Sequence, residues 1–112
     1  MKHTISLKNN YEFRRVYRKA RFYAGQFMVL YVLKNKHNYN RLGITASRKF
    51  GKSIKRNRVR RLIKENYRQI EENIKIGYDL VVIARKTDKV PEYIEIKKEM
   101  KFLFKKLNMV SK

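Results

Sequence analysis

The residues with the clearest chemical potential lie in one basic segment between Arg48 and Lys64. The segment reads RKFGKSIKRNRVRRLIK and contains nine Lys or Arg and no Asp or Glu. Guanidinium groups bind phosphate oxygens in a planar, two-pronged geometry, and the ammonium group of Lys adds a compact charge. The amide of Asn57 both donates and accepts hydrogen bonds, as contact with a base edge or a 2′-hydroxyl requires. The chemistry offered here is the binding of a phosphate polymer.

Few residues of the chain could act in acid–base catalysis or bind a metal. A metal-dependent nuclease needs clustered carboxylates, or His side chains, but no Asp or Glu lies between Phe13 and Lys64. His3 is near a terminus that we expect to be loose, and His37 lies in a polar turn, so both are predicted surface residues. Asp79 is expected to fix a turn or to pair with a cation. Without Cys there is no disulfide or thiolate site. We predict no catalytic residues, no metal site and no cofactor bound by side chains.

The charge of the whole chain agrees with a polyanionic partner. Its 112 residues include 30 Lys or Arg and 9 Asp or Glu, which gives a net charge of +21. Residues 13–64 hold 17 of the basic residues, whereas eight of the nine acids lie at Glu65 or beyond. Such one-sided charge repels itself unless a polyanion offsets it, and each neutralised phosphate releases counterions. We therefore expect nucleic-acid binding.

Length and hydropathy limit the architecture. The chain is 43% hydrophobic, enough for one folded domain over residues 1–112 but not for two separate cores. No apolar run approaches the roughly 20 residues that cross a bilayer, and the first residues do not look like a signal peptide. We expect a cytoplasmic protein that has no membrane partner.

Hydrophobic periodicity predicts the elements that position the basic segment. Asn9 and Glu12 have the spacing of a capping box, which would open a helix reaching about Arg21. Strands are predicted over 27–33 and 41–47, and the polar turn 34–40 would join them as an antiparallel hairpin. Ser53 is the expected N-cap of the longest helix, which would reach about Ile74.

The remaining chain completes a small two-layer α/β sandwich. A buried strand is predicted over 78–84 after Gly77, and Pro91 would occupy the first position of the last helix. The apolar stripe of that helix comprises Ile96, Met100, Leu103, Phe104 and Leu107. The predicted order is helix, two or three strands, helix, strand, helix, with helices packed on a mixed sheet.

The longest helix has two contrasting faces at about 100° per residue. Its apolar face comprises Val59, Leu62, Ile63, Tyr67, Ile70 and Ile74. The opposite side, which we call the basic face, comprises Asn57, Arg61, Lys64 and Arg68, flanked by Arg60 and Arg58. Like charges four residues apart cost a few tenths of a kcal/mol per pair, so a face kept only for solvation would intersperse Glu. The helix N-terminus near Ser53 adds backbone N–H donors for an anion.

Aromatic residues in the first helix admit two interpretations. Phe13, Val16, Tyr17 and Ala20 share one helical face, and the basic residues around them turn away. Aromatics at this spacing are usually core, but beside so many cations they could also form a stacking platform for bases. Tyr31, in the first long strand, is equally open between packing and binding.

With these elements in place, the chain resembles the bacterial ribonuclease P protein component. The resemblance is carried by KFG at 49–51, KRNRVRRLIK at 55–64, EFRRVY at 12–17, RLGITAS at 41–47 and YDLVVIAR at 78–85. It implies an α+β fold of order αβββαβα with an unusual left-handed βαβ crossover.

The resemblance also implies a division of labour among residues. Those that match the motif contacting the catalytic RNA are Arg56, Asn57, Arg58, Arg60, Arg61 and Lys64. Lys52 and Arg68, which are not part of that match, are expected to bind RNA with them. Those expected to line a cleft for the 5′ leader of precursor tRNA are Phe13, Tyr17, Tyr31 and Lys49. The protein would then be the non-catalytic subunit of an endoribonuclease, and its partner RNA would hold the Mg²⁺.

Other classes fit less well. Ribosomal proteins are as basic, but they often carry their charge in extended tails, whereas here it is internal. A DNA-binding helix of the helix-turn-helix type would follow another helix, whereas strands precede this one, so no DNA partner is expected. A stand-alone nuclease lacks the carboxylates described above.

Overall fold

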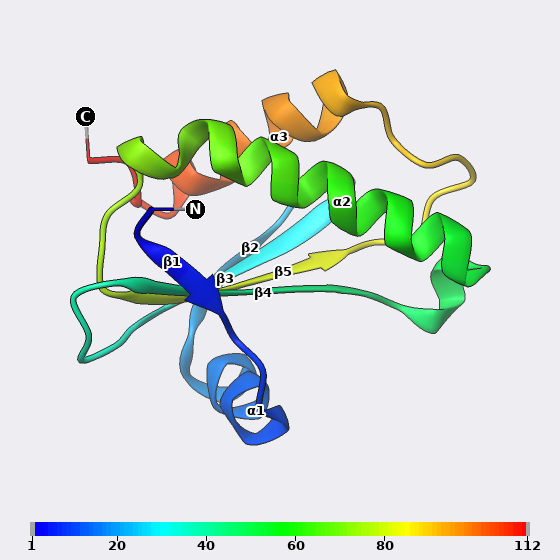
Figure 1. Ribbon diagram of the computed structural model, residues 1–112. Helices are drawn as coiled ribbons and strands as arrows, with labels where there is room; N and C mark the ends of the chain where they lie inside the picture. The colour runs from blue at the N-terminus through cyan, green and yellow to red at the C-terminus, as the bar shows by residue number, and fades with distance from the viewer. Residues whose placement is uncertain (1, 112) are drawn as a thin grey trace.

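The computed structural model describes residues 2–111 and contains a five-stranded mixed sheet with helices on both faces (Figure 1). The elements are β1 (Thr4–Ser6), α1 (Asn10–Lys19), β2 (Arg21–Ala24), β3 (Met28–Lys34), β4 (Asn40–Ala46), α2 (Ser53–Ile70), β5 (Tyr78–Ala84) and α3 (Tyr93–Lys106). Two short 3₁₀ turns, η1 (Arg48–Phe50) and η2 (Glu71–Asn73), flank α2. Within residues 2–111, no helix has the length and apolar character needed to span a membrane.

The strands follow the order β1-β4-β5-β3-β2 across the sheet. β4 pairs in parallel with both β1 and β5, whereas β3 is antiparallel to both β5 and β2. Helix α2 connects β4 to β5, so the predicted βαβ crossover is present. Its left-handed sense stays an expectation of the resemblance.

The predicted hairpin between the first two long strands is wrong. β5 lies between β3 and β4 and pairs with both, through Val81 with Tyr31 and with Gly43. Five of the seven residues of β5 are buried, and a strand that is apolar on both faces is stable only where both faces are covered. The most buried of the long strands takes the central place, and the polar turn 35–39 carries the chain across it.

The sheet has a core on each face. The larger core packs α2 and α3 against it, with Leu30, Ile63 and Phe104 almost fully buried. The smaller core lies under α1 and includes Val16 and Val81. The predicted α/β class and the element order from α1 onward are confirmed. The structure adds β1, and α1 forms a further layer opposite the other helices (Figure 1).

Several predicted helix ends shift by a few residues. Asn9 is the N-cap of α1, but its side chain makes no capping hydrogen bond. The predicted capping box is therefore wrong, because the Glu12 carboxylate pairs with Arg41 instead. α1 ends at Lys19, and the next four residues form β2 as a partner of β3.

Helix α2 begins one residue earlier than predicted and α3 begins two residues later. Lys52, not Ser53, is the N-cap of α2, and the last predicted residue, Ile74, follows the η2 turn. Pro91 precedes the N-cap of α3, so it is not the first helical residue. That helix has its own capping box: the Glu92 side chain accepts a hydrogen bond from the backbone N–H of Glu95, and the Glu95 side chain accepts one from the backbone N–H of Glu92.

The N-terminal segment was predicted to be loose but is docked. The Glu71 carboxylate accepts backbone N–H groups from Lys2 at 2.9 Å and His3 at 3.0 Å. The hydroxyl groups of Thr4 and Tyr67 are 2.8 Å apart. Burial alone would raise the pKa of Glu71, but the Thr4 hydroxyl and the two backbone N–H groups outweigh it and leave that pKa below its ordinary value.

Candidate RNA-binding site

The two predicted faces of α2 are confirmed. Val59, Ile63 and Tyr67 are buried against the sheet and α3. All four residues of the basic face are exposed, as are the nearby Lys52 and Arg58. An exposed row of cations over a rigid helix is therefore fixed in place by the apolar packing beneath it.

Two residues of the basic segment differ from free surface cations. Arg60 is half-buried and donates a hydrogen bond to the Asn57 side-chain oxygen, which orients both side chains. Arg56 is also half-buried, and its buried Nε has no hydrogen-bond partner within the described residues.

The basic face is weakest at its C-terminal end. Arg68 Nη1 lies 3.2 Å from Glu65 Oε1, and both side chains are about half exposed. Exposed pairs of this kind contribute little to stability, but the carboxylate offsets part of the local positive charge. Arg61 and Lys64, in the middle of the face, form no ion pair within the described residues.

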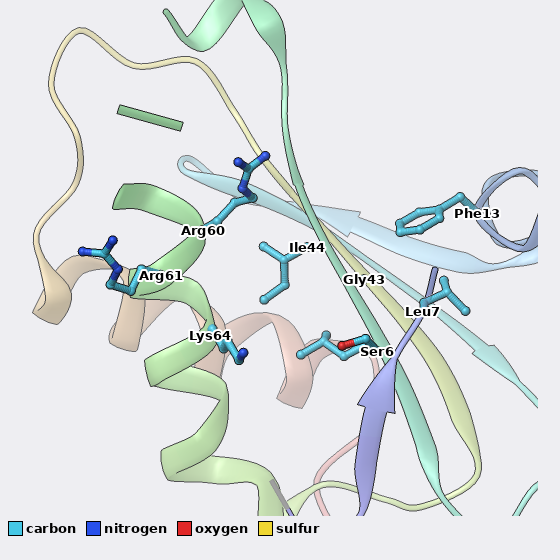
Figure 2. Close-up of a pocket in the computed structure, with 9 residues that line it drawn as sticks. Ser6, Leu7, Phe13, Gly43, Ile44, Arg60, Arg61 and Lys64 are labelled. Carbon is cyan, nitrogen blue, oxygen red and sulfur yellow. The ribbon is translucent and has the colours of Figure 1, made fainter. Parts of the chain in front are cut away.

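A pocket of about 440 Å³ joins α2 to the sheet edge (Figure 2). Its lining includes Arg60, Arg61 and Lys64 from α2, Gly43 and Ile44 from β4, and Phe13 from α1. β1 pairs with β4 only as far as Leu42, so the pocket opens where the edge of β4 loses its neighbour. Cations and an aromatic ring thus meet around one strand.

Aromatic side chains continue from this pocket across the face of the sheet under α1. Ring centroids are 6.4 Å apart for Phe13 and Tyr17, 5.2 Å for Tyr17 and Tyr31, and 5.3 Å for Tyr31 and Phe22. We call these four residues the aromatic row. Tyr17 is 40% exposed and Phe22 is 59% exposed, whereas the other two are half-buried. The row is therefore part core and part surface.

Phe22 was missed in the sequence. No element was predicted between the first helix and the strand 27–33, whereas residues 21–24 form the edge strand β2, which sets Phe22 opposite Tyr31. The adjacent aromatic residues Phe22 and Tyr23 favour a strand, but they do not identify its partner.

The environment of Tyr17 keeps its hydroxyl neutral. Burial raises the pKa of Tyr17, and the neighbouring Tyr31 raises it further. The ring therefore presents an uncharged face and a hydrogen-bonding tip, which is compatible with a phosphate chain nearby.

Lys49 lies apart from the aromatic row. It is an exposed residue of η1, beyond the C-terminal end of β4, and its backbone N–H donates to the Ser47 hydroxyl at 3.1 Å. No hydrogen bond or ring contact among residues 2–111 joins its side chain to the row. Its role beside a leader stays a prediction.

The carboxylates of Glu12 and Asp79 both pair with Arg41. Arg41 Nε and Nη2 lie 2.8 and 2.6 Å from the Asp79 oxygens, and Arg41 also pairs with Glu12. The hydrogen bond to Asp79 is the main cause that raises the pKa of Arg41. The prediction that Asp79 pairs with a cation is confirmed. Among the described residues, no three His, Cys, Asp or Glu are grouped to hold a metal ion.

Comparison with known proteins matches this arrangement to one family. The family model described as Ribonuclease P matches residues 1–108. The ribonuclease P protein component of Clostridioides difficile is 49% identical over 107 residues, covering 95% of this chain and 94% of the relative. The chain belongs to the ribonuclease P protein family.

Other ribonuclease P proteins agree across nearly the whole chain. The component from Alkaliphilus oremlandii is 41% identical over 111 residues, covering 99% of this chain and 97% of the relative. A 2.0 Å structure of the Staphylococcus aureus RNase P protein superposes with a TM-score of 0.85 at 31% identity, covering 94% of this chain and 96% of that one. The structure of the Thermotoga maritima RNase P protein superposes with a TM-score of 0.77 at 27% identity, covering 95% of this chain and 94% of that one. The resemblance noted in the sequence is confirmed, and a ribosomal protein is not favoured.

Proposed function

We propose that this chain is the protein subunit of a ribonuclease P ribonucleoprotein, which removes the 5′ leader from precursor tRNA. Membership of the family makes it a component of a tRNA-processing endoribonuclease and implies an RNA partner. The observation that carries the proposal is the pocket that brings the cations of α2 and the aromatic row together around the edge of β4. An RNA bound on α2 and a second RNA strand bound on the aromatic row would lie side by side at this pocket.

The basic face binds the catalytic RNA in this proposal. The full set of contact residues is the one expected from the sequence: Lys52, Arg56, Asn57, Arg58, Arg60, Arg61, Lys64 and Arg68. The exposure of Lys52, Arg58, Arg61, Lys64 and Arg68 supports it, since charge-assisted hydrogen bonds to phosphate are strong and directional. Arg60 holds Asn57 in a fixed orientation, which suits contact with a 2′-hydroxyl or base edge.

The aromatic row binds the leader. Base–aromatic stacking contributes about 1–3 kcal/mol per base and accepts any base, so it suits leaders of varied sequence. The partial exposure of Tyr17 and Phe22 supports this use of the row. Phe13 and Tyr31 then combine packing with binding, and Lys49 is proposed to contact a leader phosphate.

The protein supplies charge and position rather than chemistry. Cleavage and the Mg²⁺ ions that support it belong to the catalytic RNA in this proposal, and no side chain of the protein acts as an acid or base. Cations near the junction of two RNA strands would lower their mutual repulsion and so lower the Mg²⁺ concentration that cleavage needs. Because bacteria transcribe tRNA in the cytoplasm, the proposal assigns the protein to that compartment.

Discrimination between precursor and mature tRNA tests this function. A bacterial ribonuclease P RNA is assembled with or without the protein, and its dissociation constants for precursor tRNA and for mature tRNA are measured. We expect the protein to tighten binding of the precursor much more than binding of the mature tRNA, because only the precursor carries a leader. Equal effects on both would contradict a leader-binding role.

A further inference from the structure

A second aromatic cluster lies on the opposite side of the sheet from the aromatic row. The rings of Tyr23 and Phe102 meet edge to face at 5.9 Å, and Lys106 Nζ lies 5.7 Å from the Tyr23 ring centroid. Tyr23 is 37% exposed and Phe102 is 51% exposed. We call Tyr23, Phe102 and Lys106 the edge patch. Two large rings that remain this exposed beside a cation offer a surface for stacking.

The charge around the edge patch is strongly positive. Three exposed lysines lie three or four residues from Phe102 along α3: Lys98, Lys105 and Lys106. Residues at this spacing are neighbours on the surface of a helix. The nearest acid on that side of α3, Glu99, is occupied, because its carboxylate accepts the backbone N–H groups of residues 26–28 in the β2–β3 turn. Glu95 lies on the same side two turns before Phe102, where its carboxylate accepts the Glu92 backbone N–H at the start of the helix. The Glu99 carboxylate is therefore held by the turn instead of countering the lysines.

The edge patch is continuous with the aromatic row around one strand. β2 is the last strand of the sheet, and its consecutive residues point to opposite faces. Phe22 stacks on Tyr31 on the face that α1 covers, while Tyr23 meets Phe102 of α3 on the other face. A chain leaving the row over Phe22 would reach Tyr23 by passing around the edge of the sheet.

We propose that the edge patch binds single-stranded RNA, namely the 5′ portion of a leader that is longer than the aromatic row accommodates. The inference rests on the proposed function, since it extends the path of the same leader. Stacking rings flanked by cations are how proteins hold single strands without reading their sequence. A second copy of this chain fits the patch less well, because each copy carries a charge of +21 and would be repelled.

Leader length provides the test. The protein is assembled with a bacterial ribonuclease P RNA, and dissociation constants are measured for precursor tRNAs with leaders of about 4 and about 16 nucleotides, the range of single-strand site sizes. Phe102→Leu removes the stacking ring but keeps an apolar side chain against Tyr23. We expect this variant, and Phe102→Ala, to weaken binding of the long leader about fivefold or more and to leave the short leader unchanged.

Tyr93→Ala is the matched control. Tyr93 is another aromatic residue of α3 with 39% exposure, and it lies nine residues from Phe102, which places it on the opposite side of the helix. We expect wild-type affinity for both leaders in this variant. Thermal melting of each variant verifies that the fold is retained.

The comparison with Tyr17→Ala separates two kinds of failure. If Tyr17→Ala weakens both leaders while Phe102→Leu weakens neither, the edge patch is not an RNA site and the proposed function stands. If neither variant affects either leader, both proposals are overturned. If Phe102→Leu instead converts a dimer to a monomer in sedimentation, without any change for the long leader, the patch is a contact between copies and the RNA proposal fails.

Discussion

Phe13 lies directly on Gly43: a Cβ atom built on Gly43 would come within 2.5 Å of the ring carbons Cε1 and Cζ of Phe13. Real Cβ atoms do not approach carbon so closely, so the ring rests where only glycine leaves room. Because Phe13 lines the pocket beside Arg60 and Arg61, this contact sets how near the aromatic row comes to the basic face.

Gly43→Ala should therefore displace the Phe13 ring. Overpacking of this kind costs about 1–3 kcal/mol, which urea unfolding would measure, and the displaced ring should also weaken binding of precursor tRNA. In the double variant with Phe13→Ala the clash is gone, so the two effects should not add. If the effects of Gly43→Ala and Phe13→Ala added in the double variant, the two residues would not interact.

Tyr17→Ala should weaken precursor tRNA binding and spare assembly with the catalytic RNA. The side chain is 40% exposed, so its removal costs little core packing, while the loss of one stacked base corresponds to about 1–3 kcal/mol. Tyr17→Phe keeps the ring and is the matched control. The measurement is the dissociation constant for precursor tRNA in the assembled ribonucleoprotein; if assembly failed instead, Tyr17 would be a core residue.

Arg61→Ala with Lys64→Ala should weaken binding to the catalytic RNA and flatten its salt dependence. Each lost phosphate contact lowers the slope of log affinity against log salt by about 0.7–0.9, so the double variant should lose about 1.5. Lys34→Ala with Lys36→Ala removes the same charge from β3 and its following turn and should change the slope less. Equal slopes for the wild type and the Arg61/Lys64 variant would exclude the basic face as the RNA contact.

Acid should loosen the N-terminal strand through Glu71. Its pKa is lowered in the folded protein from an ordinary value of 4.5, so the ionised carboxylate stabilises the fold above that pH, and the contribution is lost as the pH falls through the folded pKa. Glu71→Gln should be less stable than the wild type at neutral pH, and the difference should shrink below about pH 4. Urea unfolding at several pH values measures this, and a difference that stays constant with pH would contradict it.

The sequence predicted single elements better than their partners. The strand 78–84 and the apolar stripe of the last helix are confirmed residue for residue. Periodicity reports which side of an element is buried, but it does not say against what, and so β3 was paired with β4 when β5 separates them. β1 and β2 are too short to carry a periodic signal. Their stability comes from pairing with β4 and β3.

For the candidate site too, the part formed by one element could be predicted and the part formed by several could not. The basic face of α2 follows from a helical wheel because one helix positions all its residues. The aromatic row comes from α1, β2 and β3, so its fourth member, Phe22, depends on a strand pairing that local sequence does not encode. The role of Gly43 depends likewise on a contact between distant segments. The capping-box spacing of Asn9 and Glu12 was recognised in the sequence, but the competition of Arg41 for the Glu12 carboxylate was not.

The most direct test of the central claim is cleavage of precursor tRNA by a bacterial ribonuclease P RNA at low Mg²⁺. The rate of a single turnover is measured for the RNA alone, the protein alone and the two together. We expect the mixture to cleave rapidly at the 5′ end of the tRNA, the RNA alone to cleave slowly, and the protein alone to give no product. A protein that leaves the rate of the RNA unchanged, or one that cleaves without the RNA, would contradict this expectation.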